Sequence, residues 1–447
     1  MWNISSRRAM AESVVLELTV ETLGAAGDGV AHHAGLRYYI ADALPGDRLR
    51  VRVTGKRGDG FAAETVERLA EGPHRAKPAC RHFNDCGGCA AQHLDGGYYD
   101  DWKRQKVIDA LARRGLGDIE VAPLIRTAPG LRRRATFHAQ HRRQNEHRRQ
   151  NERSKADAFV GFQARASHRI VSIGECPLLL PALVALVEPL RGLFGGLLKP
   201  GGRAEAMLTQ VLGGIDMLII AVKSPDLDQC RQLVEFADKC DLARVSWRAQ
   251  GDPDPELIVL RRPVQVDFAG TAVDLPAGGF LQPSAEGEAG LRGIVMAAMA
   301  DANHIADLYA GCGALSFPLS GHARVHAVEG SAAMTAAIDR AAGRAGLAGR
   351  ITSETRDLDR QPLLAKELAR FDAVVFDPPR GGAKHQADAL AESDVPLVVA
   401  LSCNPASFAR DARILIDGGY VLDGVQPLDQ FLWTAHVEVA AIFRRGH

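Results

Sequence analysis

The sequence predicts an α/β fold class: a C-terminal doubly wound, Rossmann-like domain, preceded by a small N-terminal β-barrel and a mixed α+β central domain. Three observations predict it. Apolar runs alternate with helical segments in the last third of the chain, which is typical of a parallel sheet. Valine-rich runs separated by glycine-rich turns indicate a barrel near the N-terminus. The length of 447 residues suits about three domains, which we place at residues 11–70, 71–270 and 271–447.

The composition excludes several classes of protein. Hydrophobic residues make up 46% and charged residues 24% of the chain, as in ordinary globular proteins. No apolar run is long enough to cross a bilayer, and residues 1–12 lack the apolar core of a secretion signal. We therefore expect a cytoplasmic protein with no membrane partner, in which the eight cysteines are thiols or metal ligands. We also expect a monomer.

Basic residues gather in one segment, although the 54 basic and 54 acidic residues of the whole chain cancel. Residues 126–155 contain ten Lys or Arg and only two Glu. Such a local positive field can bind phosphate groups, because charges are screened over about 8 Å at physiological salt. Residues 140–155 lack apolar positions and are equally typical of a solvated loop, so both interpretations stay open. In residues 131–138 apolar residues interleave with Arg132, Arg133 and Arg134, and here we expect phosphate contact.

The N-terminal segment, residues 11–70, has short strands and the turn Leu44-Pro45-Gly46-Asp47. It resembles the TRAM domain, an oligonucleotide-binding type of barrel found on RNA-modifying enzymes. The resemblance implies an RNA-binding role for this segment.

Four cysteines of the central domain suggest a metal centre. Cys80, Cys86 and Cys89 have C-x5-C-x2-C spacing, close enough for three thiolates to share one metal, and Cys176 is the best candidate for a fourth ligand. Four thiolates suit zinc or an iron–sulfur cluster, and the spacing does not decide between them. Radical enzymes that cleave S-adenosylmethionine use a triplet whose first gap is two residues shorter, which weighs against that chemistry.

A glycine-rich turn follows the first strand expected in the C-terminal domain. Residues 305–313 (IADLYAGCG) read as a buried strand and a turn, where backbone N–H groups can approach a ligand closely. Glu329 ends the next strand, 22 residues after Asp307, and a carboxylate at that spacing can bind ribose hydroxyls. The full G-x-G-x-x-G fingerprint for a pyrophosphate is missing, which favours S-adenosylmethionine over a dinucleotide.

Two further strand ends carry reactive groups. Residues 371–380 (FDAVVFDPPR) place Asp377 at the end of a buried strand, before two prolines. Amino-methyltransferases share this Asp-Pro-Pro, but an aromatic residue typically follows it there, whereas Arg380 follows it here. The next strand, residues 397–401, brings Cys403 to the same rim, where a thiol can act as a nucleophile.

These motifs together resemble those of the RNA uracil-5-methyltransferases. The family motifs S-C-N-P, D-P-P-R-x-G and T-x-H-V-E stand here at residues 402–405, 377–382 and 434–438. The resemblance implies a class I methyltransferase domain that uses S-adenosylmethionine, and an RNA substrate, either rRNA or tRNA. It also implies roles for individual residues: Cys403 as the nucleophile, Glu438 as the general base, Gln282, Tyr309, Glu329 and Asp377 as contacts of S-adenosylmethionine, and Cys80, Cys86, Cys89 and Cys176 as ligands of a 4Fe–4S cluster.

The implied reaction needs these residue types. Carbon 5 of uracil is too weak a nucleophile to take a methyl group directly, so a thiolate such as that of Cys403 must first add to carbon 6. The proton on carbon 5 must then pass to a base, a role that Glu438 can fill. Two alternatives stay open: an amino-methyltransferase that binds an amine through Asp377-Pro378-Pro379, and a non-catalytic RNA-binding metalloprotein. Neither needs a nucleophilic cysteine.

Overall fold

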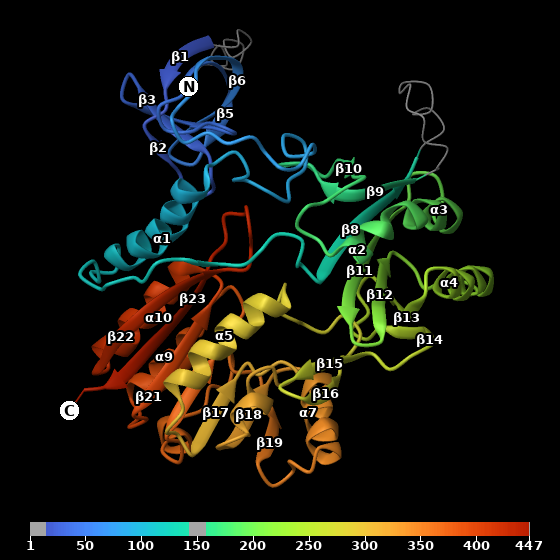
Figure 1. The fold of residues 1–447 in the computed structure, drawn as a ribbon, viewed down its shortest axis with the longest axis vertical. Coiled ribbons are helices and arrows are strands. Elements are labelled where there is room, and N and C mark those ends of the chain that lie inside the picture. Colours follow the sequence, from blue (N-terminus) through green and yellow to red (C-terminus); the bar gives the residue numbers. More distant parts are fainter. Residues whose placement is uncertain (1–14, 143–157, 447) are drawn as a thin grey trace, which may run out of the picture. The chain divides into compact units, whose positions relative to one another are not determined.

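The computed structural model describes residues 15–142 and 158–446 (Figure 1). The basic loop expected at residues 140–155 lies almost entirely outside the described residues. These divide into two compact units: the residues up to Lys106 together with Trp433–Ala435, and the residues from Val107 to Leu432 together with those from His436 on. No helix in the described part of the chain has the length and apolar character that a membrane span requires.

The first unit contains the expected barrel-like sheet. Its strands are β1 (Val15–Thr19), β2 (Thr22–Leu23), β3 (Gly29–His33), β4 (Leu36–Ile40), β5 (Arg48–Arg57) and β6 (Gly60–Ala70). They are ordered β1-β5-β6-β4-β3-β2, and β1 also packs against β3, so that the sheet curls around a core. This core contains Leu18, Ile40, Leu49 and Val51. Buried and exposed side chains alternate at the start of β5, as the two-residue period of a strand requires.

The turn that carries the TRAM resemblance has a structural role. Asp47 is fully buried, and its carboxylate accepts hydrogen bonds from the backbone N–H groups of Leu44 (2.9 Å) and Gly72 (2.7 Å). Arg75 donates to the same carboxylate at 2.5 Å. Although burial acts to raise it, these hydrogen bonds and the positive charge of Arg75 hold the pKa of Asp47 below its usual value.

The first unit also contains a short segment from near the C-terminus, Trp433–Ala435. The carbonyl of Trp433 accepts hydrogen bonds from the N–H groups of Ala90 (2.7 Å) and Ala91 (3.0 Å). The N–H of Trp433 donates to the hydroxyl of Tyr99 at 2.8 Å. This segment is therefore held by the residues of the N-terminal unit, although its neighbours in sequence belong to the second unit.

The second unit is built around an eight-stranded sheet. Its strands are β7 (Ile125–Arg126), β17 (His304–Leu308), β18 (Arg324–Glu329), β19 (Ile351–Thr355), β20 (Ala373–Phe376), β21 (Leu397–Ser402), β22 (Tyr420–Asp429) and β23 (Glu438–Arg445). The order is β19-β18-β17-β20-β21-β23-β22-β7, and β17 to β21 run parallel. Strand order reverses between β17 and β20, which in such sheets marks the ligand crevice. The doubly wound arrangement is confirmed, except that β23 is antiparallel to both neighbours, as its short connection from β22 permits.

Helices cover both faces of this sheet. They are α5 (Ala285–Ala298), α6 (Ser316–Leu319), α7 (Ala332–Arg344), α8 (Ala365–Leu368), α9 (Lys384–Ala391) and α10 (Pro405–Asp417), together with the part of α1 (Gly96–Ala112) from Val107 on. Along β20, Val374 and Phe376 pack with α9 and α10, whereas Ala373 and Val375 pack with α5 and α6. Both faces of the strand are buried, which explains its continuous apolar sequence.

A second sheet fills the middle of the chain (Figure 1). Its strands are β8 (Arg134–His141), β9 (Ala158–Gln163), β10 (Ile170–Ser172), β11 (Arg203–Val211), β12 (Gly214–Ala221), β13 (Leu242–Ala249) and β14 (Glu256–Leu260). The remaining elements are α2 (Pro181–Ala185), α3 (Val187–Leu197), α4 (Leu227–Lys239), β15 (Gln265–Phe268) and β16 (Thr271–Asp274). α3 packs on β8 and β9, and α4 packs on β13. The domain boundaries expected at residues 70 and 270 stay predictions.

Candidate active site

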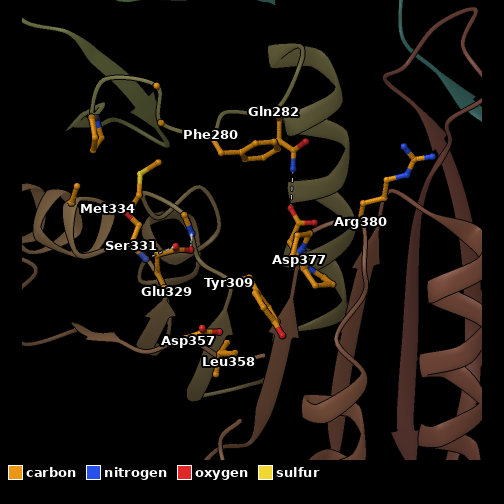
Figure 2. A pocket seen from close by; sticks show the side chains of 18 of the residues that line it. Phe280, Gln282, Tyr309, Glu329, Ser331, Met334, Asp357, Leu358, Asp377 and Arg380 are labelled. Carbon is orange, nitrogen blue, oxygen red and sulfur yellow. Dashed lines mark hydrogen bonds between the residues drawn. The ribbon is translucent and has the colours of Figure 1, made fainter. Parts of the chain in front are cut away.

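A cleft of about 860 Å³ opens where β17, β18, β20 and β21 end. This is the edge of a doubly wound sheet at which ligands bind. Four of the lining side chains, Gln282, Tyr309, Glu329 and Asp377, are seen in Figure 2. The predicted residues that line the cleft are Gln282, Tyr309, Glu329, Asp377, Cys403 and Glu438. The six residues predicted to bind S-adenosylmethionine or to act in catalysis therefore share one cavity.

The strand register explains why motifs far apart in the chain meet here. β20 and β21 pair in parallel, so the residues that follow them, Asp377 and Cys403, emerge at the same edge. Glu438 arrives from the opposite direction, because β23 is antiparallel to β21. Ser402 pairs with Val439, which places the residue after Ser402 beside the residue before Val439. Cys403 and Glu438 are therefore neighbours at the rim.

The predicted cofactor loop is tied to the next strand. Glu329, the last residue of β18, accepts hydrogen bonds from the backbone N–H groups of Gly311 (3.0 Å) and Ser331 (2.8 Å). Tyr309 and Gly311 have positive φ angles of 60° and 57°. A Cβ added at Gly311 would meet no atom of the described residues within 4 Å, beyond those flanking it. Open space in front of exposed backbone suits the close approach of a ligand.

Two carboxyl groups near the cleft have neutral hydrogen-bond partners. Asp307 is buried and accepts a hydrogen bond from the hydroxyl of Ser316 at 2.5 Å. Asp377 accepts one from the side-chain amide of Gln282 at 2.8 Å (Figure 2). Burial raises the pKa of Asp307 to about 7 and that of Asp377 to about 6. Such shifts are typical of functional sites.

Cys403 lies in the turn between β21 and α10. Asn404 caps the helix, because its side-chain oxygen accepts a hydrogen bond from the N–H of Ala406 at 3.1 Å, and Pro405 begins the first turn. The amide of Asn404 also donates to the carbonyl of Arg380 at 3.1 Å. The Ser-Cys-Asn-Pro motif is thus a strand end, a helix cap and a link to the Asp-Pro-Pro-Arg loop, and it presents the thiol to the cleft.

The thiol of Cys403 holds its proton tightly. Burial raises its pKa to about 11, and the negative charges of Glu438 and Asp377 add to the effect. Arg380 acts in the opposite direction, but more weakly, and its side chain extends away from Asp377 (Figure 2). Arg380 alone therefore does not produce a thiolate, and the site needs a proton acceptor.

Glu438 is 1% exposed and lies among neutral partners. The side-chain amide of Gln430 donates to its carboxylate at 3.2 Å. Burial raises the pKa of Glu438 to about 8, and the charge of Asp377 contributes in the same direction. A carboxyl group with a pKa near neutrality is suited to exchanging protons at physiological pH.

Two of the arginines expected to contact phosphate, Arg133 and Arg134, make hydrogen bonds beside the cleft, and phosphate contact stays a prediction. Arg133 donates to the carbonyl of Gln282 at 3.0 Å and to the carboxylate of Glu288 on α5 at 2.5 Å. Arg134 donates to the carbonyl of Leu281 at 2.9 Å. These hydrogen bonds go to the loop before α5 and to the first turn of α5, because β8 begins beside them. Their sequence pattern resembles that of a phosphate-binding segment, but their contacts position Gln282.

Two lining or supporting residues were not found from the sequence. Phe280 lines the cleft, is 57% exposed, and has the guanidinium of Arg134 over its ring at 5.1 Å. The aromatic residue two positions before Gln282 could have indicated it from the sequence. Gln430 follows β22 and reaches Glu438, and no sequence pattern pointed to it.

The four cysteines expected to bind a metal are half-buried. Cys80, Cys86 and Cys89 belong to the first unit and Cys176 to the second. Across residues 15–142 and 158–446, no three His, Cys, Asp or Glu side chains lie close enough together to hold a metal ion. This ligand set therefore stays a prediction.

Comparisons with known proteins give relatives over nearly the whole chain. An uncharacterized RNA methyltransferase of Brucella suis is 39% identical over 438 residues, covering 98% of this chain and all of that protein. An uncharacterized RNA methyltransferase of Mesorhizobium japonicum is 41% identical over 434 residues, covering 96% of this chain and 99% of that protein. No family model matches the chain.

Two further proteins that resemble this chain have a named activity, one found by sequence and the other by structure. The 23S rRNA (uracil(1939)-C(5))-methyltransferase RlmD of Chromohalobacter salexigens is 33% identical over 440 residues, covering 96% of this chain and 89% of that protein. The structure of the Pyrococcus abyssi tRNA (uracil-54, C5)-methyltransferase with S-adenosyl-L-homocysteine has a TM-score of 0.72. It covers 96% of this chain and 99% of that one, at 20% identity, which establishes similarity of fold.

Proposed function

Because the chain belongs to the RNA uracil-5-methyltransferase family, we propose that Cys403 and Glu438 are the nucleophile and the general base of an RNA uracil-5-methylation. The observation that carries this proposal is the strand register, which brings the two residues together at the rim of the cleft. S-adenosylmethionine supplies the methyl group when it is bound. Gln282, Tyr309, Glu329 and Asp377 line the cavity that would hold it.

The first chemical step is the addition of Cys403 to uracil. The thiol loses its proton to a base at the rim, and the sulfur forms a bond to carbon 6 of the ring. The electron pair of the carbon 5–carbon 6 double bond then makes carbon 5 nucleophilic. Carbon 5 would take the methyl group of S-adenosylmethionine, and the bond between that group and the sulfonium sulfur would break with its electron pair left on the sulfur. Because the pKa of Cys403 lies well above neutrality, the proton acceptor is an essential part of this step.

The second chemical step returns the enzyme to its starting state. Glu438 takes the proton from carbon 5, and the electrons of that bond restore the double bond of the ring. The bond between carbon 6 and sulfur breaks, and its electron pair returns to Cys403, which takes back the proton that the base at the rim accepted in the first step. The products are 5-methyluridine, the demethylated cofactor and one proton. This step requires the ionised form of Glu438, which burial disfavours below about pH 8.

RNA that contains 5-fluorouridine tests both roles. Fluorine at carbon 5 cannot leave as a proton, so methyl transfer should trap a covalent complex between Cys403 and the RNA. We expect this complex on denaturing gels for the wild-type protein with S-adenosylmethionine. Cys403→Ala should not form it, whereas Cys230→Ala, which removes a half-buried cysteine of α4 outside the cleft, should form it normally. Methylation that survives in Cys403→Ala would favour the amino-methyltransferase instead.

We propose 23S rRNA as the substrate. The supporting relative, RlmD, is 33% identical and covers most of the chain, whereas the tRNA enzyme from Pyrococcus abyssi shares the fold at 20% identity. The target base must leave its stack to reach Cys403, which is half-buried in the cleft, at a cost of about a few kcal/mol. Mapping of 5-methyluridine in cells that lack the gene tests the assignment: loss from 23S rRNA supports it, and loss from tRNA alone contradicts it.

We propose that the barrel supplies part of the grip on RNA. Lys56 is exposed near the tip of the β5–β6 hairpin, where it can approach a phosphate. Lys56→Glu should weaken RNA binding and lower the salt dependence of binding by about one unit of the logarithmic slope. An unchanged slope would remove this face of the barrel from the interface.

The 4Fe–4S cluster stays a proposal that rests on the spacing of Cys80, Cys86 and Cys89 and on the family resemblance. Protein purified without air should contain iron and acid-labile sulfide in equal amounts. Cys86→Ser and Cys176→Ser should lose both, and Cys230→Ser should keep both. Zinc in place of iron would contradict the cluster. No step of the proposed reaction passes through it.

A further inference from the structure

Four side chains form a continuous hydrogen-bonded chain beneath the cleft. The amide of Gln282 donates to the carboxylate of Asp377 at 2.8 Å. The amide of Gln430 donates to the side-chain oxygen of Gln282 at 2.7 Å and to the carboxylate of Glu438 at 3.2 Å. Two neutral amides thus connect the carboxylate on the cofactor side of the cleft to the proposed general base.

Gln430 is the centre of this chain. It directly follows β22 and is 4% exposed. Its amide nitrogen makes both hydrogen bonds, while its oxygen, Oε1, has no hydrogen-bond partner among the described residues. A buried acceptor without a donor destabilises a fold, so packing alone would favour an apolar side chain at this position.

The fold also leaves room for this side chain. Gly287 lies in the first turns of α5, and a Cβ added there would stand 2.7 Å from both Cβ and Oε1 of Gln430. The absence of a side chain at Gly287 of α5 therefore leaves the space that the carboxamide of Gln430 occupies. A second glycine of α5, Gly293, would meet no atom of the described chain within 4 Å if it gained a Cβ. The two glycines form a matched pair for experiment.

We propose that Gln430 is a positioning residue for proton abstraction, which holds one oxygen of Glu438 so that the other faces carbon 5 of the substrate. This inference rests on the proposed function. The N–H of Gln430 stabilises the ionised carboxylate before the proton moves. Once Glu438 is protonated it carries an O–H donor, which the N–H of Gln430 cannot accept, so the hydrogen bond favours the ionised form that takes the proton.

The inference predicts a change in pH dependence. The titratable groups that line the cleft with Glu438 include Asp377 after β20, Cys403 after β21 and His436 before β23, with Tyr309, Glu329, Arg356, Asp357, Asp359 and Arg380 elsewhere in its lining. Of these, the negative charge of Asp377 raises the pKa of Glu438, whereas the hydrogen bond from Gln430 lowers it. Loss of that bond should therefore raise the pKa of Glu438 further, and the rate should depend on a more alkaline ionisation.

Gln430→Met tests this, because methionine has a similar length and no N–H donor. Release of tritium from carbon-5-labelled uridine in RNA should slow about tenfold at neutral pH, and the acid limb of its pH profile should move up by about one unit. The covalent complex with ordinary uridine should accumulate, because elimination is delayed. Gln426→Met is the control: it lies on β22, its amide donates to the carbonyls of Pro123 and Pro427, and it should behave as wild type.

Gly287→Ala is an independent test, because it keeps the side-chain amide of Gln430 but pushes it out of position. It should slow tritium release about threefold and shift the acid limb in the same direction, and Gly293→Ala should do neither. Melting temperatures identify variants that fail to fold. If Gln430→Met is one of them, the pH profile of Gly287→Ala tests the role of Gln430 in its place.

An unshifted pH profile in a folded Gln430→Met or Gly287→Ala variant would overturn the role of Gln430. Because such a variant would still make 5-methyluridine through Cys403, that result leaves the proposed function standing, whereas turnover by Cys403→Ala would remove both.

Discussion

Acidic side chains have charged partners on the barrel surface and neutral partners at the cleft. On the barrel surface, acids face arginines: the pairs are Arg37 with Asp59 at 2.5 Å, Arg50 with Glu67 at 2.5 Å, Arg52 with Glu64 at 2.9 Å and Arg57 with Asp28 at 2.6 Å. In the cleft, Asp307, Asp377 and Glu438 are held by a serine and two glutamines. Exposed ion pairs contribute little to stability, whereas carboxyl groups buried with neutral partners keep protons near neutral pH. The difference separates exposed acids, whose charge an arginine balances, from buried acids that can exchange protons near neutral pH.

The largest effect should come from the cleft. Glu438→Gln keeps the size of the side chain but cannot accept a proton, so formation of 5-methyluridine should fall by about 10³-fold. Methyl transfer precedes this step, and a covalent complex with ordinary uridine should therefore accumulate. Single-turnover measurements of methyl transfer and tritium release distinguish the two steps. Equal slowing of both would show that Glu438 acts earlier than proposed.

The next effect should come from the one buried acid of the barrel turn. Asp47→Asn leaves Arg75 beside a neutral amide and removes a charged acceptor for two backbone N–H groups, which should cost about 3 kcal/mol of barrel stability. Hydrogen exchange of barrel amides in the full chain measures it. Asp59→Asn, at an exposed pair, is the matched control and should cost under about 1 kcal/mol. Similar losses in both would remove the distinction between buried and surface acids.

A smaller effect is expected in the pH dependence of stability, through the buried carboxyl group of Glu438. Folding raises the pKa of Glu438 to about 8, so the folded protein binds this proton more tightly than the unfolded chain does. The stability that the protonated group contributes is therefore present at acid pH and is lost as pH rises towards 8. Glu438→Gln does not titrate, and its melting temperature relative to wild type should rise between pH 5 and pH 8. A difference that stays constant with pH would contradict the buried, protonated carboxyl.

The smallest effect belongs to the barrel surface. Arg52→Gln removes an exposed pair with Glu64, in which both side chains are about half exposed, and should change stability by less than about 1 kcal/mol. Urea unfolding followed by barrel fluorescence measures it. A loss above about 2 kcal/mol would mean that the surface arginines support the fold more than their exposure indicates.

The sequence predicted the parts of the molecule that repeat a simple pattern. The strands that became β17, β18, β20 and β21 are apolar because both faces are buried, and their ends carry the motif residues. Parallel pairing then brings Asp377 and Cys403 to one edge without further information. The reversed direction of β23 was not predicted, yet it is what puts Glu438 beside Cys403.

Contacts between distant segments could not be predicted from the sequence. Arg133 and Arg134 form a basic run, and the sequence does not reveal that β8 begins beside the loop at Gln282. Gln430 has no motif of its own, because its role depends on Gly287 leaving space in a helix more than 140 residues earlier. Such roles follow from packing between distant segments, which neither composition nor periodicity records.

The segment Trp433–Ala435 limits how this enzyme can be truncated or its domains exchanged. It is held by Ala90, Ala91 and Tyr99, and three residues after it the chain reaches Glu438. A truncation that removed the N-terminal unit would leave these backbone groups without partners immediately upstream of the proposed base. The methyl-transferring half is therefore not a portable module, and chimaeras that exchange N-terminal barrels between relatives should carry this tripeptide along with the barrel.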